Sequence, residues 1–215
     1  MSLFYDCTKP AERADAVGAA ADAVRRGDLV VLPTDTVYGI GADAFIPSAV
    51  AALLRAKGRG RDMPVPVLVG SRAALDGLVL HVPGRARDLI EAFWPGALTV
   101  VLEHAPSLAW DLGETRGTVA VRMPLHPVAL DLLKQTGPMA VSSANRSGQP
   151  APTTAAGARE QLGEQVAIYL DGGPAGDPVP SAIVDLTGDP PRLLRPGAVT
   201  ADQLRGVVPD LRTDD

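Results

Sequence analysis

Short apolar runs rich in valine and leucine recur along the chain and alternate with segments of helical periodicity. Runs of this length fit buried strands, and the segments between several of them repeat apolar residues at helical spacing. The runs lie at 29–32, 65–69, 98–102, 119–121, 139–141, 166–170 and 182–186. Strands interleaved with helices predict an α/β or α+β sheet rather than a helical bundle or a β-sandwich. The stretch between 102 and 119 has no clear helix, so part of the sheet is expected to be antiparallel.

The helices that flank this sheet are expected in segments with clear start or stop signals. They cover residues 11–26, 47–56, 83–93, 127–135 and a segment that runs from Thr153 or Thr154 to Leu162. Proline at 47 fits a first helical turn, and the glycines at 27 and 58 are typical stop signals.

Size, charge and cysteine content limit the class of protein. With 215 residues, 46% of them apolar, the chain is long enough for one domain with a full core. The net charge of −5 argues against general coating of nucleic acid. The lone Cys7 cannot form an internal disulfide, which favours a reducing compartment. The sequence shows neither a leader nor a long apolar span, so we expect a cytoplasmic protein without membrane contact.

Two polar regions are expected to be loosely held. Residues 172–180 are rich in glycine and proline and predict a mobile surface loop. Both ends of the chain, outside about residues 13–208, are expected to fray.

Two polar loops indicate a phosphate-bearing ligand. Residues 142–148 read S-S-A-N-R-S-G after an apolar run, which is where α/β folds place ligands. This loop offers hydroxyl and amide hydrogen bonds but no base-activated nucleophile. The cluster Lys57-Gly-Arg59-Gly-Arg61 supplies positive charge, and its glycines let the backbone bend around a polyphosphate. A basic cluster alone is more often a solvated face, but alternating glycines do not suit a solvated helix end.

Further polar side chains follow other predicted strands. Thr34, Thr36 and Tyr38 are expected to face a small polar ligand, unless the threonines only satisfy a turn. Arg122 lies in line with a sheet face and therefore needs a carboxylate or a ligand as partner. The segment that begins at Ser181 adds another hydroxyl near the C-terminus.

Other chemistries find little support. His81, His104 and His126 are scattered, without the spacing of metal ligands. There is no G-x-x-x-x-G-K-[ST] loop, and Gly39-Ile-Gly41 is only half of a G-x-G-x-x-G motif.

Taken in order, the motifs resemble the YrdC-like family of threonylcarbamoyladenylate synthases. The matching blocks are PTDTVYGIG at 33–41, the K-x-R of Lys57 and Arg59, FWPGALTVVL at 93–102, TVAVRMP at 118–124, SSANRSGQPAPT at 142–153, the segment from Ser181, and LRPGAV at 194–199. The similarity extends from about residue 13 to 208. The K-x-R and S-x-N signatures are short, but their occurrence in this order with the other blocks is highly specific.

The resemblance implies a twisted mixed parallel and antiparallel sheet, flanked by helices around a positively lined groove. It implies a single domain over residues 1–215 with no additional C-terminal domain. The implied enzyme is a nucleotidyltransferase that joins L-threonine, bicarbonate and ATP to give threonylcarbamoyladenylate and pyrophosphate. ATP is then a substrate, used with a divalent metal such as Mg²⁺. The product serves threonylcarbamoyladenosine modification of transfer RNA, so the downstream threonylcarbamoyl transferase proteins and transfer RNA itself are candidate partners.

The resemblance also implies roles for individual residues. Nucleotide contacts fall to Lys57, Arg59, Thr118, Ser143, Asn145, Thr153 and Arg195, with Lys57 and Arg59 as the catalytic pair. Contacts to threonine or its carbamate fall to Thr34, Thr36, Tyr38, Arg122 and Ser181. No protein ligand for the metal is identified. Met63 and Leu68 stand where many relatives have asparagine and histidine, so the contacts of those two side chains are absent from this wall of the site.

Two other functions remain open at this point. The same fold could form an RNA- or nucleotide-binding module without turnover, although the acidic chain has few aromatic residues for base stacking. It could also be an accessory domain for carbamoyl transfer within a larger enzyme.

Overall fold

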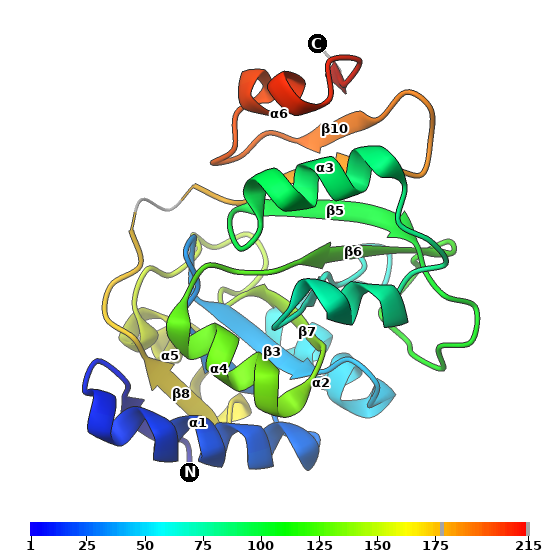
Figure 1. Ribbon diagram of the computed structural model, residues 1–215. Coiled ribbons are helices and arrows are strands. Elements are labelled where there is room, and N and C mark those ends of the chain that lie inside the picture. The colour runs from blue at the N-terminus through cyan, green and yellow to red at the C-terminus, as the bar shows by residue number, and fades with distance from the viewer. Residues whose placement is uncertain (177–178, 214–215) are drawn as a thin grey trace.

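The structure is a computed structural model that describes residues 1–176 and 179–213. Within them, eleven strands form one sheet in the order β1-β8-β2-β3-β7-β4-β6-β5-β9-β10-β11 (Figure 1). Some neighbours pair antiparallel, as β2 with β3, and others parallel, as β4 with β6. The strands are β1 (Leu3–Asp6), β2 (Val30–Leu32), β3 (Gly39–Asp43), β4 (Val67–Leu68), β5 (Leu98–Glu103), β6 (Thr118–Arg122), β7 (Met139–Ser143), β8 (Ile168–Asp171), β9 (Ala182–Asp185), β10 (Arg192–Arg195) and β11 (Arg212–Thr213).

The helices begin and end close to the predicted signals. They are α1 (Pro10–Arg25), α2 (Pro47–Lys57), α3 (Gly84–Phe93), α4 (Pro127–Thr136), α5 (Ala155–Leu162) and α6 (Ala201–Val207), with the short 3₁₀ helices η1 (Arg72–Gly77) and η2 (Gly163–Gln165). Gly58 ends α2 in the left-handed conformation with φ 63°. Of the two threonines considered as caps, Thr154 accepts the Gly157 amide at 3.0 Å and caps α5. The predicted mixed sheet with flanking helices is confirmed.

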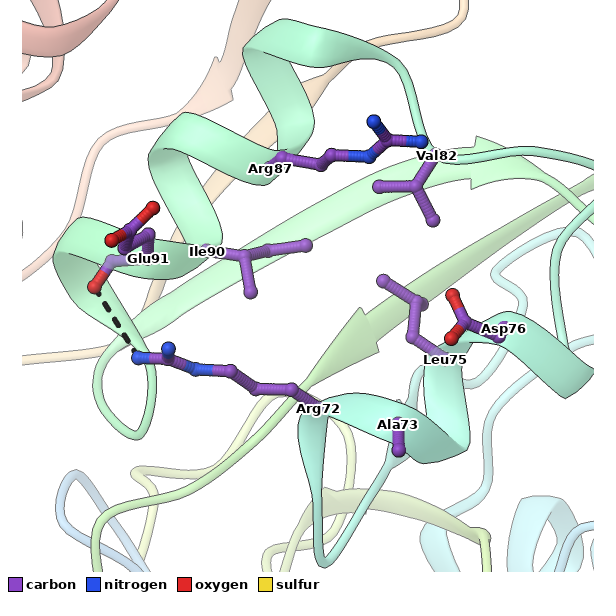
Figure 2. A pocket seen from close by; sticks show the side chains of 8 residues that line it. All are labelled: Arg72, Ala73, Leu75, Asp76, Val82, Arg87, Ile90 and Glu91. Carbon is purple, nitrogen blue, oxygen red and sulfur yellow. Dashed lines mark hydrogen bonds between the residues drawn. The ribbon is translucent and has the colours of Figure 1, made fainter.

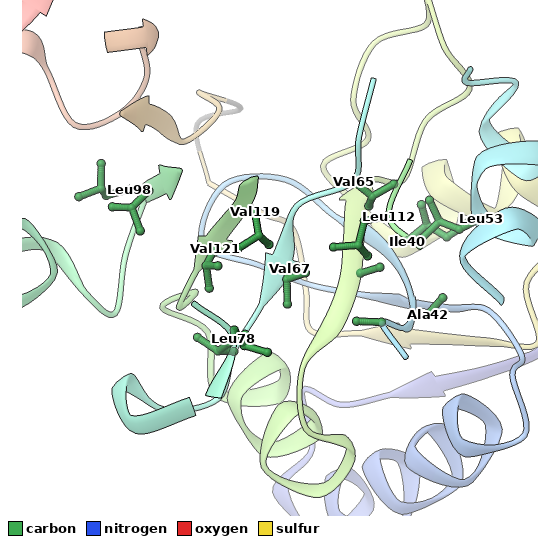
Figure 3. Close-up of a cluster of buried hydrophobic side chains, with 14 of the residues drawn as sticks. Ile40, Ala42, Leu53, Val65, Val67, Leu78, Leu98, Leu112, Val119 and Val121 are labelled. Atoms are coloured by element: carbon green, nitrogen blue, oxygen red, sulfur yellow. The ribbon is translucent and has the colours of Figure 1, made fainter. Parts of the chain in front are cut away.

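The two faces of the sheet are covered by different helices. Val67 points into a large core under α2, α3, α5 and α6, where it meets Val121 (Figure 3). The next residue, Leu68, points to the opposite face and joins a second core under α1 and α4, with Met139 and Val141. Adjacent strand residues face opposite sides, so the two cores share one sheet between them.

A third part of the sheet is left for polar side chains. The alternate β5 residues Leu98, Val100 and Leu102 lie in the large core, which turns Thr99 to the opposite face. The second core contains no residue of β5, β6, β9 or β10 among those that the structure describes. This open portion of the sheet is where Arg122 and other polar groups gather.

Gly39 and Gly41 serve packing rather than phosphate binding. Both lie in β3, a strand absent from the sequence-based prediction, which treated this segment as a turn. A Cβ atom on Gly39 would come within 2.7 Å of Val141 Cγ1, and one on Gly41 within 2.8 Å of Met139 Cε. The glycines therefore make room for two bulky β7 side chains in the second core.

The expectation that both ends fray is wrong where they join the sheet. Leu3–Asp6 pairs parallel with β8, and Arg212–Thr213 pairs parallel with β10. Leu211 is buried, so an apolar anchor holds the C-terminal segment against the large core. The polar C-terminal residues and the short N-terminal strand gave no side-chain signal of this main-chain pairing, which does not depend on side-chain type.

The predicted surface loop at 172–180 lies between β8 and β9, and its residues 177 and 178 lie outside the described part of the chain. At its start, Gly172 and Gly173 contact the hydroxyl of Tyr38. Among the described residues, no helix combines the length and apolarity needed to cross a membrane.

Candidate active site

Lys57 joins the end of α2 to the polar loop after β7. Its side chain is only 3% exposed, and Nζ donates to the carbonyl oxygens of Ser143 and Asn145, the latter at 2.7 Å. Burial lowers the pKa of the ammonium to about 8, with a smaller contribution from the positive charge of Arg59. Its hydrogen-bond partners in the described part of the chain are loop oxygens rather than carboxylates.

Arg59 contacts the same loop from the other side of the glycine turn. Its Nη1 donates to Ser142 Oγ at 3.1 Å, and its Nε and Nη2 donate to the carbonyls of Met63 and Pro64 at 2.9 and 3.1 Å. Burial lowers the pKa of this guanidinium. The predicted meeting of a cationic loop and a neutral donor loop is therefore present in the structure.

Arg61 was expected to extend the positive charge of the loop, but its guanidinium is paired with a carboxylate. It forms a two-pronged ion pair with Asp111, with N–O distances of 2.7 and 3.0 Å. Its carbonyl accepts the Glu114 amide at 2.8 Å. Gly113, at φ 101°, brings the facing loop so close that a Cβ there would lie 2.7 Å from the Arg61 carbonyl oxygen. The segment around Asp111 thus supports the turn that carries Arg59.

Arg122 has the partner that its position on the sheet required. Its Nη2 lies 2.7 Å from Asp35 Oδ1, its Nη1 donates to Thr36 Oγ1 at 3.1 Å, and its Nε donates to the Gly96 carbonyl at 2.9 Å. The side chains of Arg122 and Asp35 are 8% and 15% exposed. Thr34 Oγ1 lies 3.1 Å from Thr36 Oγ1, so both predicted threonines belong to this network.

A second set of polar residues, two of which carry hydroxyls, extends across the open portion of the sheet. Thr99 Oγ1 lies 2.8 Å from Ser181 Oγ, which also accepts from Arg195 Nη2 at 3.1 Å. Arg195 pairs across β10 and β9 with Ile183, which in turn pairs with Thr99 on β5. Since Val100 pairs with Val121, Thr99 and Arg122 also lie side by side.

The cations of this region act on one another. Burial and the positive charges of Arg122 and Arg59 lower the pKa of Arg195. Among the described residues, Asp35 is the one carboxylate that forms an ion pair with any of the four cations Lys57, Arg59, Arg122 and Arg195. We call these four residues the cationic cluster. Its uncompensated charge suits an anion with several negative groups.

Tyr38 comes two residues after Thr36, and its hydroxyl contacts the start of the loop after β8. The side chain is fully buried, and its hydroxyl donates to the Gly173 carbonyl, lies 3.1 Å from Asp171 Oδ1 and accepts the Gly172 amide at 3.1 Å. These contacts fix the start of the loop that leads to Ser181. A direct contact of Tyr38 with substrate remains a prediction.

Thr118 and Thr153 are farther from these hydrogen bonds. Thr118 begins β6, whereas Arg122 ends it, and four residues of strand span roughly 13 Å. The Thr118 hydroxyl donates to the Thr115 carbonyl at 2.8 Å. The carbonyl of Thr153 accepts the Ala175 amide at 2.7 Å. Both residues are half-buried, and their nucleotide contacts remain predictions.

The two departures from the family pattern have different structural consequences. Met63 is exposed, and its carbonyl holds Arg59, a contact that does not depend on the side chain. Leu68 is buried in the second core and pairs with both Arg122 and Met139 across neighbouring strands. An apolar core residue therefore stands where the resemblance implied a histidine.

Three contributors escaped the sequence analysis: Asp35, Ser142 and Thr99. Asp35 could have been found, because Arg122 needs a carboxylate and Asp35 is the centre of the T-D-T segment. Ser142 could not be separated from Ser143, since both are serines in one run. Thr99 lies inside an apolar strand, and only the register places it beside Ser181.

A cavity of about 320 Å³ between η1 and α3 contains no member of the cationic cluster (Figure 2). Its lining is formed by Arg72, Ala73, Leu75, Asp76, Val82, Arg87, Ile90 and Glu91. Arg72 donates to the carbonyls of Glu91 and Trp94 at the end of α3, and Gly96, two residues beyond Trp94, accepts from Arg122. The cavity thus lies behind the turn that supports Arg122, and the active-site assignment rests on the cluster.

Comparison with known proteins decides the family. The family model Sua5_yciO_yrdC, described as "Telomere recombination", matches residues 22–197. The chain belongs to this Sua5/YciO/YrdC family. A Mycobacterium tuberculosis protein is 60% identical over 208 residues, which covers 97% of this chain and 96% of the relative. A protein of Bacillus subtilis named threonylcarbamoyl-AMP synthase is 40% identical over 215 residues, with 98% of this chain and 62% of that protein covered.

Solved structures of the Sua5/YciO/YrdC family share the fold. A Sua5 from Pyrococcus abyssi, in a structure described as complexed with L-threonine, superposes with a TM-score of 0.93 at 36% identity. All of this chain is covered, but it spans only 62% of that Sua5 chain. Escherichia coli YciO superposes with a TM-score of 0.81 at 25% identity, covering 92% of this chain and 97% of its own.

Proposed function

We propose that this chain is a threonylcarbamoyladenylate synthase. It joins L-threonine, bicarbonate and ATP to give threonylcarbamoyladenylate and pyrophosphate, for threonylcarbamoyladenosine modification of transfer RNA. The observation that carries the proposal is the cationic cluster, with four positive side chains and a single paired carboxylate. The named Bacillus subtilis relative and the threonine complex of the Pyrococcus abyssi protein support the same substrates.

The chemistry needs positioning and charge rather than a protein nucleophile. The threonine amine and bicarbonate combine, with loss of water, into a carbamate. A carbamate oxygen then attacks the α-phosphorus of ATP, a new P–O bond forms, and the bond to the pyrophosphate leaving group breaks. Two anions must be held together, and the negative charge of the transferring phosphoryl group must be neutralised. The absence of a histidine or thiol in the polar loop is compatible with this reaction.

The residue roles follow the family pattern, and the geometry supports part of it. Nucleotide contacts are proposed for Arg59, Thr118, Ser143, Asn145, Thr153 and Arg195, and Lys57 belongs to the same phosphate-binding region. Threonine or carbamate contacts are proposed for Thr34, Thr36, Tyr38, Arg122 and Ser181. Arg122 keeps further N–H donors beyond its three protein contacts, which suits a carboxylate or carbamate. The positive charge of Arg59 contributes to lowering the pKa of Arg195, which supports a role for both residues in binding one polyanion.

A divalent metal would enter with the nucleotide. In residues 1–176 and 179–213, no three His, Cys, Asp or Glu side chains lie together in a way that could hold a metal ion. Asp35, the one described carboxylate that pairs with the cluster, is already held by Arg122. The described residues therefore do not form a resident metal site. A Mg²⁺ ion carried by the phosphates of ATP is part of the substrate.

The test is pyrophosphate release from ATP that requires both threonine and bicarbonate. Omission of either compound should abolish release above background, and mass spectrometry should detect threonylcarbamoyladenylate. ATP binding without pyrophosphate release would contradict the proposal and favour a nucleotide-binding module.

The product would pass to the downstream threonylcarbamoyl transferase proteins. We place this reaction in the cytoplasm, where a free buried thiol such as Cys7 stays reduced. Direct contact with transfer RNA is a separate proposal, tested by binding measured at several salt concentrations.

A further inference from the structure

We propose that Lys57 is a positioning residue, whose buried ammonium holds the Ser143–Ser147 segment in its ligand-binding shape instead of touching the reacting atoms. What the segment binds rests on the proposed function, but the positioning role concerns the ligand-free protein. The other cation of the K-x-R motif, Arg59, then carries the direct phosphate contact.

The surroundings of Nζ account for all the hydrogen atoms of the ammonium. The carbonyl oxygens of Ser143 and Asn145 accept from it, and Asn145 Oδ1 and Ser143 Oγ lie at 3.4 and 3.5 Å. An ammonium group has three N–H donors. Four oxygens from one short segment therefore lie within hydrogen-bonding distance of these three donors, so the ammonium is directed at the segment.

The main chain of Lys57 holds the same segment a second time. The carbonyl oxygen of Lys57 accepts the Ser147 amide at 2.8 Å. Because Lys57 is the last residue of α2, this carbonyl has no partner within the helix. Lys57 thus binds the segment at Ser143 and Asn145 through its side chain and at Ser147 through its backbone carbonyl.

Other parts of the protein also hydrogen-bond to the backbone of residues 144–147, so the oxygens that accept from the Lys57 ammonium have fixed positions. Ala144 is fully buried, and its amide donates to the Tyr38 carbonyl at 2.8 Å. The Arg146 amide donates to Gln161 Oε1 at 3.0 Å. Of residues 144–147, the Asn145 amide alone finds no acceptor within the described chain. The contacts with Lys57 therefore leave one backbone donor of the segment, the Asn145 amide, without a protein acceptor.

Arg59 differs from Lys57 in its contacts. Its three acceptors are Ser142 Oγ and the carbonyls of Met63 and Pro64, so it touches the polar loop through a single hydroxyl. A guanidinium has five N–H donors, and Arg59 therefore keeps two for an anion. Loss of Lys57 should disturb the segment, whereas loss of Arg59 should disturb mainly the ligand.

Amide hydrogen exchange of the ligand-free protein tests this division. In Lys57→Met, exchange of the Ala144 and Ser147 amides should accelerate about tenfold or more, because the ammonium grip is gone. In the matched control Arg59→Met, the same amides should change by less than about threefold. Calorimetric titration with a non-hydrolysable ATP analogue should show weaker binding for both variants.

Lys57→Gln separates hydrogen bonding from charge. Its amide keeps two N–H donors on a stem close in length to that of methionine, so it should restore part of the exchange protection. The proposal is overturned if Lys57→Met exchanges like the wild type while losing affinity, or if glutamine protects no better than methionine. If Lys57→Met does not fold, the exchange rates of the Ala144 and Ser147 amides are compared between Lys57→Gln and Arg59→Gln. Faster exchange in Lys57→Gln supports the proposal, and equal exchange overturns it. These exchange rates need no nucleotide, so they stand even if ATP is not the substrate.

Discussion

Asp35 holds two separate parts of the site with one carboxylate oxygen, since Oδ1 lies 2.7 Å from Arg122 Nη2 and 2.9 Å from the Leu125 amide nitrogen. The first contact orients the guanidinium, and the second fixes the turn that follows β6. Both charged side chains are largely buried, at 15% and 8% exposure. The pair therefore differs from the ion pairs on the surface of the molecule.

Asp35→Ala should destabilise the fold strongly, because it leaves the Arg122 guanidinium buried without a counter-charge. Removing one partner of a buried pair lowers the free energy of unfolding by about 3–5 kcal/mol. The matched control is Asp111→Ala, which breaks the exposed pair with Arg61 and should cost about 0–1 kcal/mol. Urea denaturation of both variants gives the comparison. Equal losses would mean that Asp35 adds no more than a surface contact.

Gly18 and Gly39 should respond in opposite ways to alanine. Gly18 lies within α1, and a Cβ atom there meets no atom within 4 Å. Gly18→Ala should therefore raise the free energy of unfolding by about 0.5–1 kcal/mol through helix propensity. Gly39→Ala should lower it by about 1–3 kcal/mol, because the new methyl would press on Val141 Cγ1 at 2.7 Å. A stabilising Gly39→Ala would refute the packing role assigned to this glycine.

Local signals predicted what depends on neighbouring residues in the chain. The proline at 47 and the glycine at 58 marked the ends of α2, which the structure places within one residue of the predicted end at 56. The need of Arg122 for a partner was also predictable, because a charge on a sheet face cannot remain alone. Identifying that partner required the tertiary fold, since Asp35 lies 87 residues away.

Long-range pairing explains most of what the sequence did not reveal. β3 carries two glycines and looked like a turn, and it became a strand because Val141 and Met139 fill the space that those glycines leave. β1 and β11 are polar or short, and they are strands because β8 and β10 offer them free edges. The row that connects Arg122, Thr99 and Arg195 exists only through register across four strands.

Nucleotide affinity should fall as pH rises through about 8, the pKa of Lys57 in the free protein, which burial and the charge of Arg59 have lowered. A bound polyphosphate favours the ammonium form and raises that pKa, so the complex retains a proton that the free protein loses. By linkage, affinity declines by up to about tenfold per pH unit above this value and is flat below it. Titrations in two buffers of different ionisation enthalpy would measure the proton uptake.

Lys57→Gln is the control for this pH dependence, since it cannot titrate. It should show weaker binding that stays level between pH 7 and about 9. A wild-type affinity that is equally independent of pH would exclude Lys57 as the titrating group.

The lowered pKa of Lys57 also affects folding. Between about pH 8 and the ordinary pKa of 10.5, folding releases a proton from this lysine, so its contribution to the free energy of unfolding rises with pH in that window.

Asn145 and Arg146 are neighbours whose side chains should differ sharply in importance. Asn145 is half-buried, and its Nδ2 donates to the carbonyls of Gln149 and Arg146 at 2.7 and 2.9 Å, while its Oδ1 faces Lys57. Arg146 is exposed, and its contact with Gln161 uses the backbone amide rather than the guanidinium. Truncation at 145 removes three side-chain contacts of the polar loop, whereas truncation at 146 removes none that the structure records.

Asn145→Ala should therefore lower affinity for a non-hydrolysable ATP analogue at least about tenfold, on the order of 1.4 kcal/mol. Arg146→Ala removes one positive charge from an exposed position, where solvent and salt screen it, so its effect should be several-fold smaller and should shrink further as salt is added. Calorimetric titration at two salt concentrations distinguishes the two cases. An unchanged affinity in Asn145→Ala, or a larger loss in Arg146→Ala, would show that the nucleotide approaches the loop from its solvent side and not from the side of Lys57 and Arg59.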